Sequence, residues 1–168
     1  VYPFGAPLFH LVESGHDVPY TLRYLSLDAA APPDVPQYRL LMPAETKTEL
    51  IQRNPYSDEL LPVTFVYQDE VFPFARLRYR GSIKRLWPVK SYRIDLQYDH
   101  DLAGNNELNL NGKRPGPEWL ANEVFRQNGF ATPLLQNVRL AINHADQGPY
   151  LSIEKIGKDY LERNFPDA

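Results

Sequence analysis

Basic residues gather in one short stretch of this 168-residue sequence. Seven of the 18 lysines and arginines, and none of the 21 acidic residues, fall between positions 76 and 93. The whole chain has a formal net charge of only −3, so this stretch is a positive block in an acidic background. Arg76, Arg78 and Arg80 alternate along it, which on a β-strand places their guanidinium groups on one face. Because like charges on one face repel one another, the pattern predicts an anionic partner nearby.

Two interpretations of this block remain open. The glycine turn at Gly81 and Ser82 would let backbone N–H groups approach an anion closely, and Lys90 lies on or beside the next predicted strand. Together with Arg78 and Arg80, these residues form a candidate phosphate-binding site. The alternative is a solvated strand face whose arginines pair with the surplus carboxylates of the chain.

Two carboxylates could take part in the same site. Glu118 lies in the first turn of a predicted helix, where it could hold a strand lysine in place for a phosphate, as protein kinases do. A glutamate at that position also complements the helix dipole without any other role. Glu154 ends an apolar strand, where it lies either at an edge or in a cleft.

Several classes of protein are excluded or disfavoured. Without cysteine there is no disulfide framework and no thiolate chemistry, and the redox compartment is left open. The four histidines lack metal-ligand spacing, and no nucleophile elbow, Walker sequence or Rossmann fingerprint is present. Apolar runs are too short to span a bilayer, and the mild acidity argues against a protein that coats nucleic acid.

The elements that must position these residues follow from periodicity and turn residues. Strands are expected over 38–42, 61–67, 71–79, 91–98, 108–111, 138–142 and 150–154, and helices over 44–53, 117–128 and 157–165. The helix over 117–128 is the best defined, with an apolar face formed by Trp119, Leu120, Val124 and Phe125. The predicted fold class is therefore α+β, a mostly antiparallel β-sheet with a packed helix.

The proline-rich run over 29–36 predicts a linker. Residues 1–36 are then the end of a preceding segment, with a strand over 20–27, and residues 37–168 form the second domain.

Five ordered motifs resemble a known family. They are Arg78-Tyr79-Arg80-Gly81-Ser82, Pro88-Val89-Lys90-Ser91-Tyr92-Arg93-Ile94, Leu108-Asn109-Leu110-Asn111, the helix through Val124-Phe125-Arg126 with Gly129 and Pro133, and Tyr150-Leu151-Ser152-Ile153-Glu154. Their order and spacing resemble the spore coat protein H (CotH) family of atypical, secreted or coat-associated protein kinases. The resemblance runs from about Tyr38 to Phe165.

The resemblance implies a protein-kinase-like N-lobe with the C-lobe absent. Lys90 would be the lysine of the nucleotide phosphates, with Glu118 as its ion-pair partner. The loop of Arg80, Gly81 and Ser82, together with Arg78, would lie near the phosphates. Glu154 would enter the hinge near the adenine.

The implied activity is transfer of the ATP γ-phosphate to serine or threonine of coat or extracellular proteins, with Mg²⁺ or Mn²⁺ as cofactor. The implied location is secreted or at the cell surface or spore coat. The aspartates that complete catalysis would belong to the C-lobe of the same parent chain, so this chain alone is expected to be an inactive fragment.

Two competing hypotheses come from other classes of protein. The first is a non-catalytic structural or adhesion module of a secreted assembly, whose basic strand binds an anionic polymer or a partner surface. A nucleic-acid binder ranks last, because the arginines occur without a recognised motif.

Overall fold

A computed structural model describes residues 8–11, 20–23, 35–97, 100–143 and 145–166. The chain divides into two compact units, Val1–Ala30 and Ala31–Ala168. In the first unit, β1 (Leu8–Leu11) pairs antiparallel with β2 (Tyr20–Arg23). The rest of the expected strand over 20–27 and most of the predicted linker lie outside the described residues. The division at residue 36 stays a prediction.

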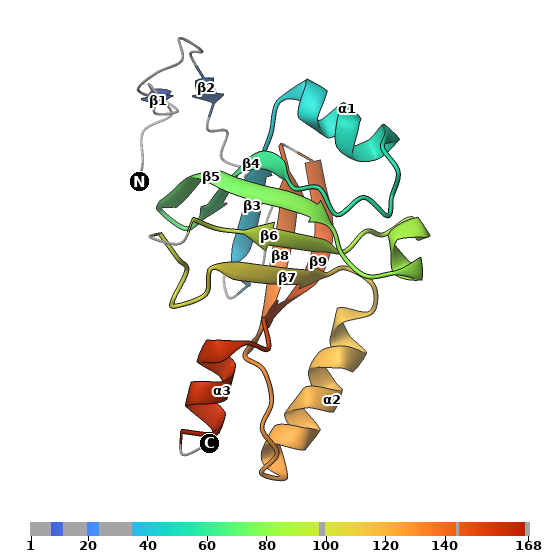
Figure 1. Ribbon diagram of the computed structural model, residues 1–168, viewed down its shortest axis with the longest axis vertical. Coiled ribbons are helices and arrows are strands. Elements are labelled where there is room, and N and C mark those ends of the chain that lie inside the picture. The colour runs from blue at the N-terminus through green and yellow to red at the C-terminus, as the bar shows by residue number, and fades with distance from the viewer. Residues whose placement is uncertain (1–7, 12–19, 24–34, 98–99, 144, 167–168) are drawn as a thin grey trace. The chain divides into compact units, whose positions relative to one another are not determined.

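The second unit is built on a closed barrel of seven strands in the order β3-β4-β5-β6-β7-β9-β8 (Figure 1). The strands are β3 (Gln37–Leu41), β4 (Leu61–Tyr67), β5 (Glu70–Tyr79), β6 (Tyr92–Asp95), β7 (Glu107–Asn111), β8 (Leu135–Ile142) and β9 (Ala145–Glu154). The helices are α1 (Ala44–Gln52), α2 (Pro115–Gln127) and α3 (Lys158–Asn164), with a 3₁₀ turn at Ile83–Leu86. The positions of the elements expected from the sequence are therefore confirmed to within a few residues.

Closure of the barrel contradicts the expected kinase-like sheet with a packed helix. Strand β3 pairs antiparallel with β4 and also parallel with β8, where Gln37 lies opposite Arg139 and Leu40 opposite Ile142. This parallel pairing joins segments about 100 residues apart and makes the sheet mixed. Local periodicity does not reveal which distant strand a given strand will pair with, so the expected kinase-like fold was wrong.

The core fills the barrel because alternate residues of each strand point inward. On β5, for example, Leu77 and Tyr79 are buried while Arg76 is exposed. Tyr38 and Phe65 meet edge to face, with ring centroids 5.0 Å apart. The largest fully buried side chains are Tyr38, Phe65, Phe72, Leu40, Leu77, Ile94, Leu110, Leu140, Leu151, Val66 and Val138.

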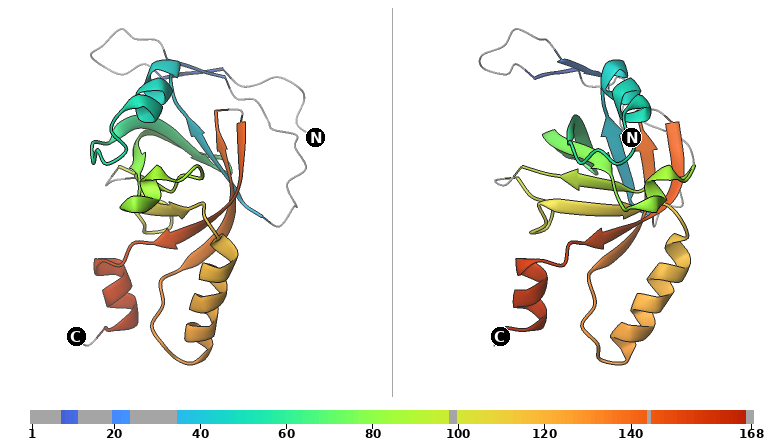
Figure 2. Two further views of the ribbon diagram at one scale, coloured as in Figure 1. Left: turned by 90° about the vertical axis from the view of Figure 1, so that its right-hand side faces the viewer. Right: turned by 45° about the vertical axis from the view of Figure 1, so that its right-hand side comes forward.

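Helix α2 does not pack on the sheet as expected. None of its residues is buried, and Leu120 and Phe125 of its predicted apolar face are 57% and 54% exposed. Helices α2 and α3 instead extend from the same end of the barrel (Figures 1 and 2). The periodicity correctly predicted an amphipathic helix, but its apolar face stays largely exposed instead of packing into the barrel core. Within the described ranges, no helix has the length and hydrophobicity needed to cross a membrane.

Candidate anion-binding site

The arginines of β5 lie on the outer face of the barrel, as the sequence predicts. Arg76 and Arg78 alternate with the buried Leu77 and Tyr79. Arg80 follows the strand and continues its pairing, because its backbone N–H donates to the carbonyl of Ser91 at 2.8 Å. The side chains of Arg76, Arg78 and Arg80 therefore project from β5 and from the residue that directly continues this strand.

Carboxylates pair with several of these arginines. Arg78 Nη1 lies 2.9 Å from Asp58 Oδ1, and Arg76 Nη2 lies 3.9 Å from Asp95 Oδ2. Arg93 holds both Asp95 and Glu107, at 2.6 and 2.9 Å. The ion-paired strand face, one of the two interpretations of the basic block, is thus present for Arg76, Arg78 and Arg93.

The loop after β5 is fixed by Arg85, a buried residue whose role carries no signal in the local sequence. Arg85 Nε donates to the carbonyl of Gly81 at 2.5 Å, and Nη2 lies 2.7 Å from Asp58 Oδ1. Its Nη1 donates to the carbonyl of Ser57 at 3.1 Å. Gly81 has φ +97°, a left-handed conformation that favours glycine. The hydrogen bond from Arg85, together with the charge of Arg78, lowers the pKa of Asp58.

Lys90 lies at the end of the barrel nearest this loop. Its Nζ donates to the carbonyl of Arg85 at 2.7 Å and lies 5.2 Å from the centroid of the Tyr79 ring. The Tyr150 hydroxyl donates to the backbone carbonyl of Lys90 at 3.0 Å. Lys90 thus sits on a ring of a buried tyrosine, with a carbonyl rather than a carboxylate as its hydrogen-bond partner.

Glu118 contacts Arg80 through Asn111 and is not ion-paired with Lys90 among the described residues. Arg80 Nη1 donates to Asn111 Oδ1 at 2.5 Å, and Asn111 Nδ2 donates to Glu118 Oε2 at 2.7 Å. Burial lowers the pKa of Arg80, and the charges of Glu118 and Glu107 oppose that effect. The amide therefore connects a cation of the basic block to the first turn of α2. The expected direct contact between Lys90 and Glu118 is not formed, and the roles assigned to the two residues stay predictions.

Glu154 ends β9 in a tightly paired position. Both its carboxylate oxygens accept hydrogen bonds from Arg163 of α3 at 2.5 Å, and Oε2 also accepts from the backbone N–H of Leu134 at 2.9 Å. Burial by itself would raise the pKa of Glu154, but these hydrogen bonds outweigh it and the pKa is lowered. Glu154 thus joins α3 to the barrel, and its predicted position near an adenine ring is not tested by this geometry.

Sequence reasoning missed two further residues of this region. Asn111 ends the motif Leu108-Asn109-Leu110-Asn111, whose alternation predicts no more than a strand end there. Arg53 follows α1, and its Nη1 donates to the carbonyl of Glu59 at 2.8 Å. An asparagine or an arginine at an element boundary carries no local signal of its contacts, because these depend on segments distant in the sequence.

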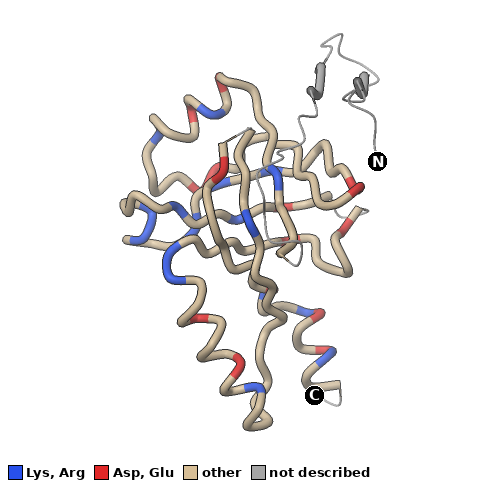
Figure 3. The backbone as a smooth tube through the Cα atoms, turned by 180° about the vertical axis from the view of Figure 1, so that it is seen from behind, with Lys and Arg blue, Asp and Glu red and all other residues tan. Residues whose placement is uncertain are grey.

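The residues present suit an anion better than a metal ion. Lysine and arginine positions cluster along the loop that follows β5 and at the start of α2 (Figure 3). Within the described ranges, no group of three or more histidine or acidic side chains is placed to hold a metal ion. The region can neutralise and orient a phosphate-like group, whereas the ligands for a divalent cation are not gathered in this part of the chain.

The second unit is therefore a small mixed β-barrel with a basic loop at one end. The sequence profile of a family described as CotH kinase protein matches residues 77–168, which is more than half of the chain. The chain belongs to this family, as its motifs predicted.

One curated relative is the inner spore coat protein H of Bacillus subtilis (strain 168). It is 24% identical to this chain over 134 residues, which cover 77% of this chain and 36% of the relative. The chain thus spans little more than a third of the length of that protein.

Proposed function

We propose that this chain is the nucleotide-binding part of a CotH-family protein kinase. In the complete protein, the γ-phosphate of ATP would pass to serine or threonine of coat or extracellular proteins. The observation that carries the proposal is the excess of positive charge at the end of the barrel. There Arg78 and Arg85 share the single carboxylate of Asp58, and the Nζ of Lys90 donates to a backbone carbonyl and has no carboxylate partner among the described residues.

Each residue of this region has a proposed task. Lys90 would neutralise phosphate charge, since its ammonium group has no carboxylate partner to displace in the part of the chain that the structure describes. Arg80 would face the same phosphates, with Asn111 and Glu118 setting its orientation. The Gly81 and Ser82 backbone would approach the phosphates closely, because glycine leaves room there. A bound Mg²⁺ or Mn²⁺ would neutralise the phosphate oxygens, and its protein ligands would come from outside the described residues.

The remainder of a complete kinase is the proposed partner of the exposed helices. Leu120, Val124 and Phe125 of α2, together with Leu161 and Phe165 near the C-terminal end, are all about half exposed. Exposed apolar surface of this kind marks interaction sites. We also propose association with a spore coat or a cell surface, since the matched relative is named as an inner spore coat protein.

The alternative of an anion-binding structural module is not better supported. It requires the arginines of β5 to be available to a polymer, whereas Arg76 and Arg78 are paired with Asp95 and Asp58.

The test is binding of a fluorescent ATP analogue to the full chain, with and without Mg²⁺. Lys90→Ala is expected to weaken binding by about tenfold or more, because a charge-assisted contact to phosphate is lost. Lys84→Ala is the matched control, since Lys84 is an exposed lysine in the same loop. Equal affinity of wild type and Lys90→Ala would remove Lys90 from the site, and no binding by the wild type would reject the proposal for this chain.

A further inference from the structure

The guanidinium group of Arg53 is buried in part and is only partly hydrogen-bonded. Its Nη1 donates to the carbonyl of Glu59, but its Nε and Nη2 atoms are buried and have no hydrogen-bond partner. These two nitrogens are the only buried side-chain polar atoms without a partner in the described part of the chain. Arg53 also forms none of the ion pairs found among the described residues.

The two unpaired nitrogens form one edge of the guanidinium group, and the same edge binds a carboxylate in Arg139 and in Arg126. Arg139 holds Asp146 through Nε at 2.9 Å and Nη2 at 2.7 Å. Arg126 holds Glu123 through the same two atoms at 2.9 and 2.5 Å. In Arg53, therefore, the donor pair best suited to a carboxylate or a phosphate is unused.

An unused, enclosed donor pair lowers the stability of the folded state. Burying a hydrogen-bond donor without an acceptor costs about 1–3 kcal/mol, and more for a charged group. An apolar side chain of similar length would avoid that cost. A role in ligand binding would account for an arginine at this position.

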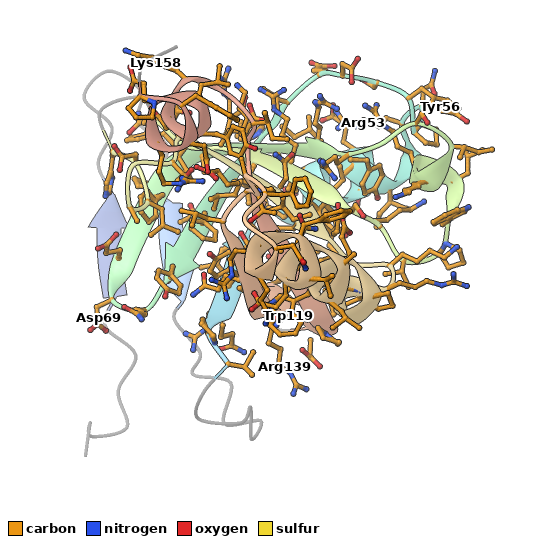
Figure 4. All side chains as sticks on the ribbon, turned by 90° about the horizontal axis from the view of Figure 1, so that it is seen from below. Arg53, Tyr56, Asp69, Trp119, Arg139 and Lys158 are labelled. Carbon is orange, nitrogen blue, oxygen red and sulfur yellow. The ribbon has the colours of Figure 1, made fainter. Side chains whose placement is uncertain are left out.

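The position of Arg53 indicates the ligand. Arg85 donates to the carbonyls of Pro55 and Ser57, so the segment that follows Arg53 is tied to the loop after β5. Burial raises the pKa of Tyr79, and the charge of Arg53 opposes that effect, which agrees with Arg53 lying near the tyrosine. The Nζ of Lys90 approaches the same ring. Figure 4 shows Arg53 beside Tyr56, at the side of the barrel away from Asp69 of the β4–β5 turn.

We propose that Arg53 is a phosphate-binding residue whose Nε and Nη2 donate to an oxyanion held jointly with Lys90. The oxyanion is a phosphate group, either inorganic phosphate or a phosphate of a nucleotide. Because both nitrogens are enclosed, the Arg53 side chain or the 54–58 segment shifts when the anion enters. The phosphate site itself does not depend on the proposed function. Only the assignment of the phosphate to a nucleotide rests on that function.

The test uses the full chain with inorganic phosphate, at constant ionic strength set by sodium chloride. Arg53→Met removes the charge and keeps the length of the side chain, and Lys47→Met on α1 is the matched control. Arg53→Met is expected to weaken phosphate binding by about tenfold or more, measured by calorimetry. Its melting temperature without phosphate is expected to equal or exceed that of the wild type, because an unsatisfied buried charge is removed. A merely structural arginine would give a lower melting temperature.

Several outcomes would overturn the proposal. The first is that the wild type does not bind phosphate. The second is that folded Arg53→Met binds phosphate with an affinity within about twofold of the wild type. The third is that Lys47→Met loses as much affinity as Arg53→Met. If circular dichroism shows that Arg53→Met does not fold, Arg53→Lys decides by the same criterion, because lysine keeps the charge but lacks the donor edge.

A parallel titration with ATP and adenosine separates this proposal from the proposed function. Arg53-dependent phosphate binding without a preference for ATP would reject the nucleotide-binding function alone. ATP binding that depends on Lys90 but is indifferent to Arg53 would reject the role of Arg53 alone.

Discussion

The Tyr150 hydroxyl donates to the backbone carbonyl of Lys90 at 3.0 Å, which connects the middle of β9 to the residue expected to bind phosphate. Gly112, the residue after β7, packs against both partners. A Cβ atom added at Gly112 would lie 2.6 Å from Tyr150 Cε1 and 2.8 Å from the Lys90 carbonyl oxygen. The position of Lys90 thus depends on the absence of a side chain at residue 112.

Gly112→Ala is expected to destabilise the protein by about 2 kcal/mol, because the added methyl group overlaps the Tyr150 ring and must displace it. Gly116→Ala is the control, since a Cβ atom added at Gly116 would have no neighbour within 4 Å. It should change stability by less than about 0.5 kcal/mol, because the better helix propensity of alanine is offset by its position before Pro117. Urea unfolding measures both changes, and a neutral Gly112→Ala would contradict the close packing.

Asn111 is expected to couple Arg80 to Glu118. Asn111→Leu leaves both charged groups without their amide partner and should cost about 2 kcal/mol in the free energy of unfolding. In a double-mutant cycle, Asn111→Leu and Glu118→Gln should show a coupling energy of about 1 kcal/mol. Asn122→Ala serves as control, because within the described ranges that amide donates to a carbonyl of its own helix and to no charged side chain. Additive effects at Asn111 and Glu118 would show that the bridge contributes nothing.

Glu154→Gln is expected to weaken the attachment of α3. The loss at neutral pH should be about 2 kcal/mol, below the range for fully buried pairs because the Arg163 side chain is 37% exposed. The pKa of Glu154 in the folded protein lies below its ordinary value of 4.5. The carboxylate therefore stabilises the fold above about pH 4.5, and this contribution is lost as the pH falls through the lower, folded-state pKa.

Unfolding free energies of wild type and Glu154→Gln, measured from pH 7 down to pH 3, check this dependence. The difference between the two proteins should shrink with acidification. Glu162→Gln, in an exposed pair with Lys158, should match the wild type throughout. A difference that stays constant with pH would show that the Glu154 carboxylate is not the titrating group.

Substitutions on the apolar face of α2 are expected to leave the barrel stable. Leu120→Gln should change the free energy of unfolding by less than about 0.5 kcal/mol, because Leu120 is exposed and surface changes have small effects. Leu110→Ala in the core should cost about 3 kcal/mol in the same urea experiment. A large loss for Leu120→Gln would mean that α2 packs against the barrel after all.

The sequence by itself was enough to predict the helices and strands and which of their residues share a face. Alternation along 71–79 placed Arg76 and Arg78 on one face of β5, and the helix expected to end at residue 128 ends at Gln127. These features depend on neighbours one to four residues away, so residue order is enough to predict them. The family also followed from short motifs in a fixed order.

Only the tertiary structure decided which segments meet. Closure of the barrel depends on the parallel pairing of β3 with β8, and the apolar face of α2 is exposed because strand residues and Leu50 of α1 fill the core. Glu118 meets Asn111 instead of Lys90, and Arg53 keeps two donors unpaired, for the same reason. Such contacts join residues far apart in the chain, and their geometry is set by strand register and packing that no local pattern encodes.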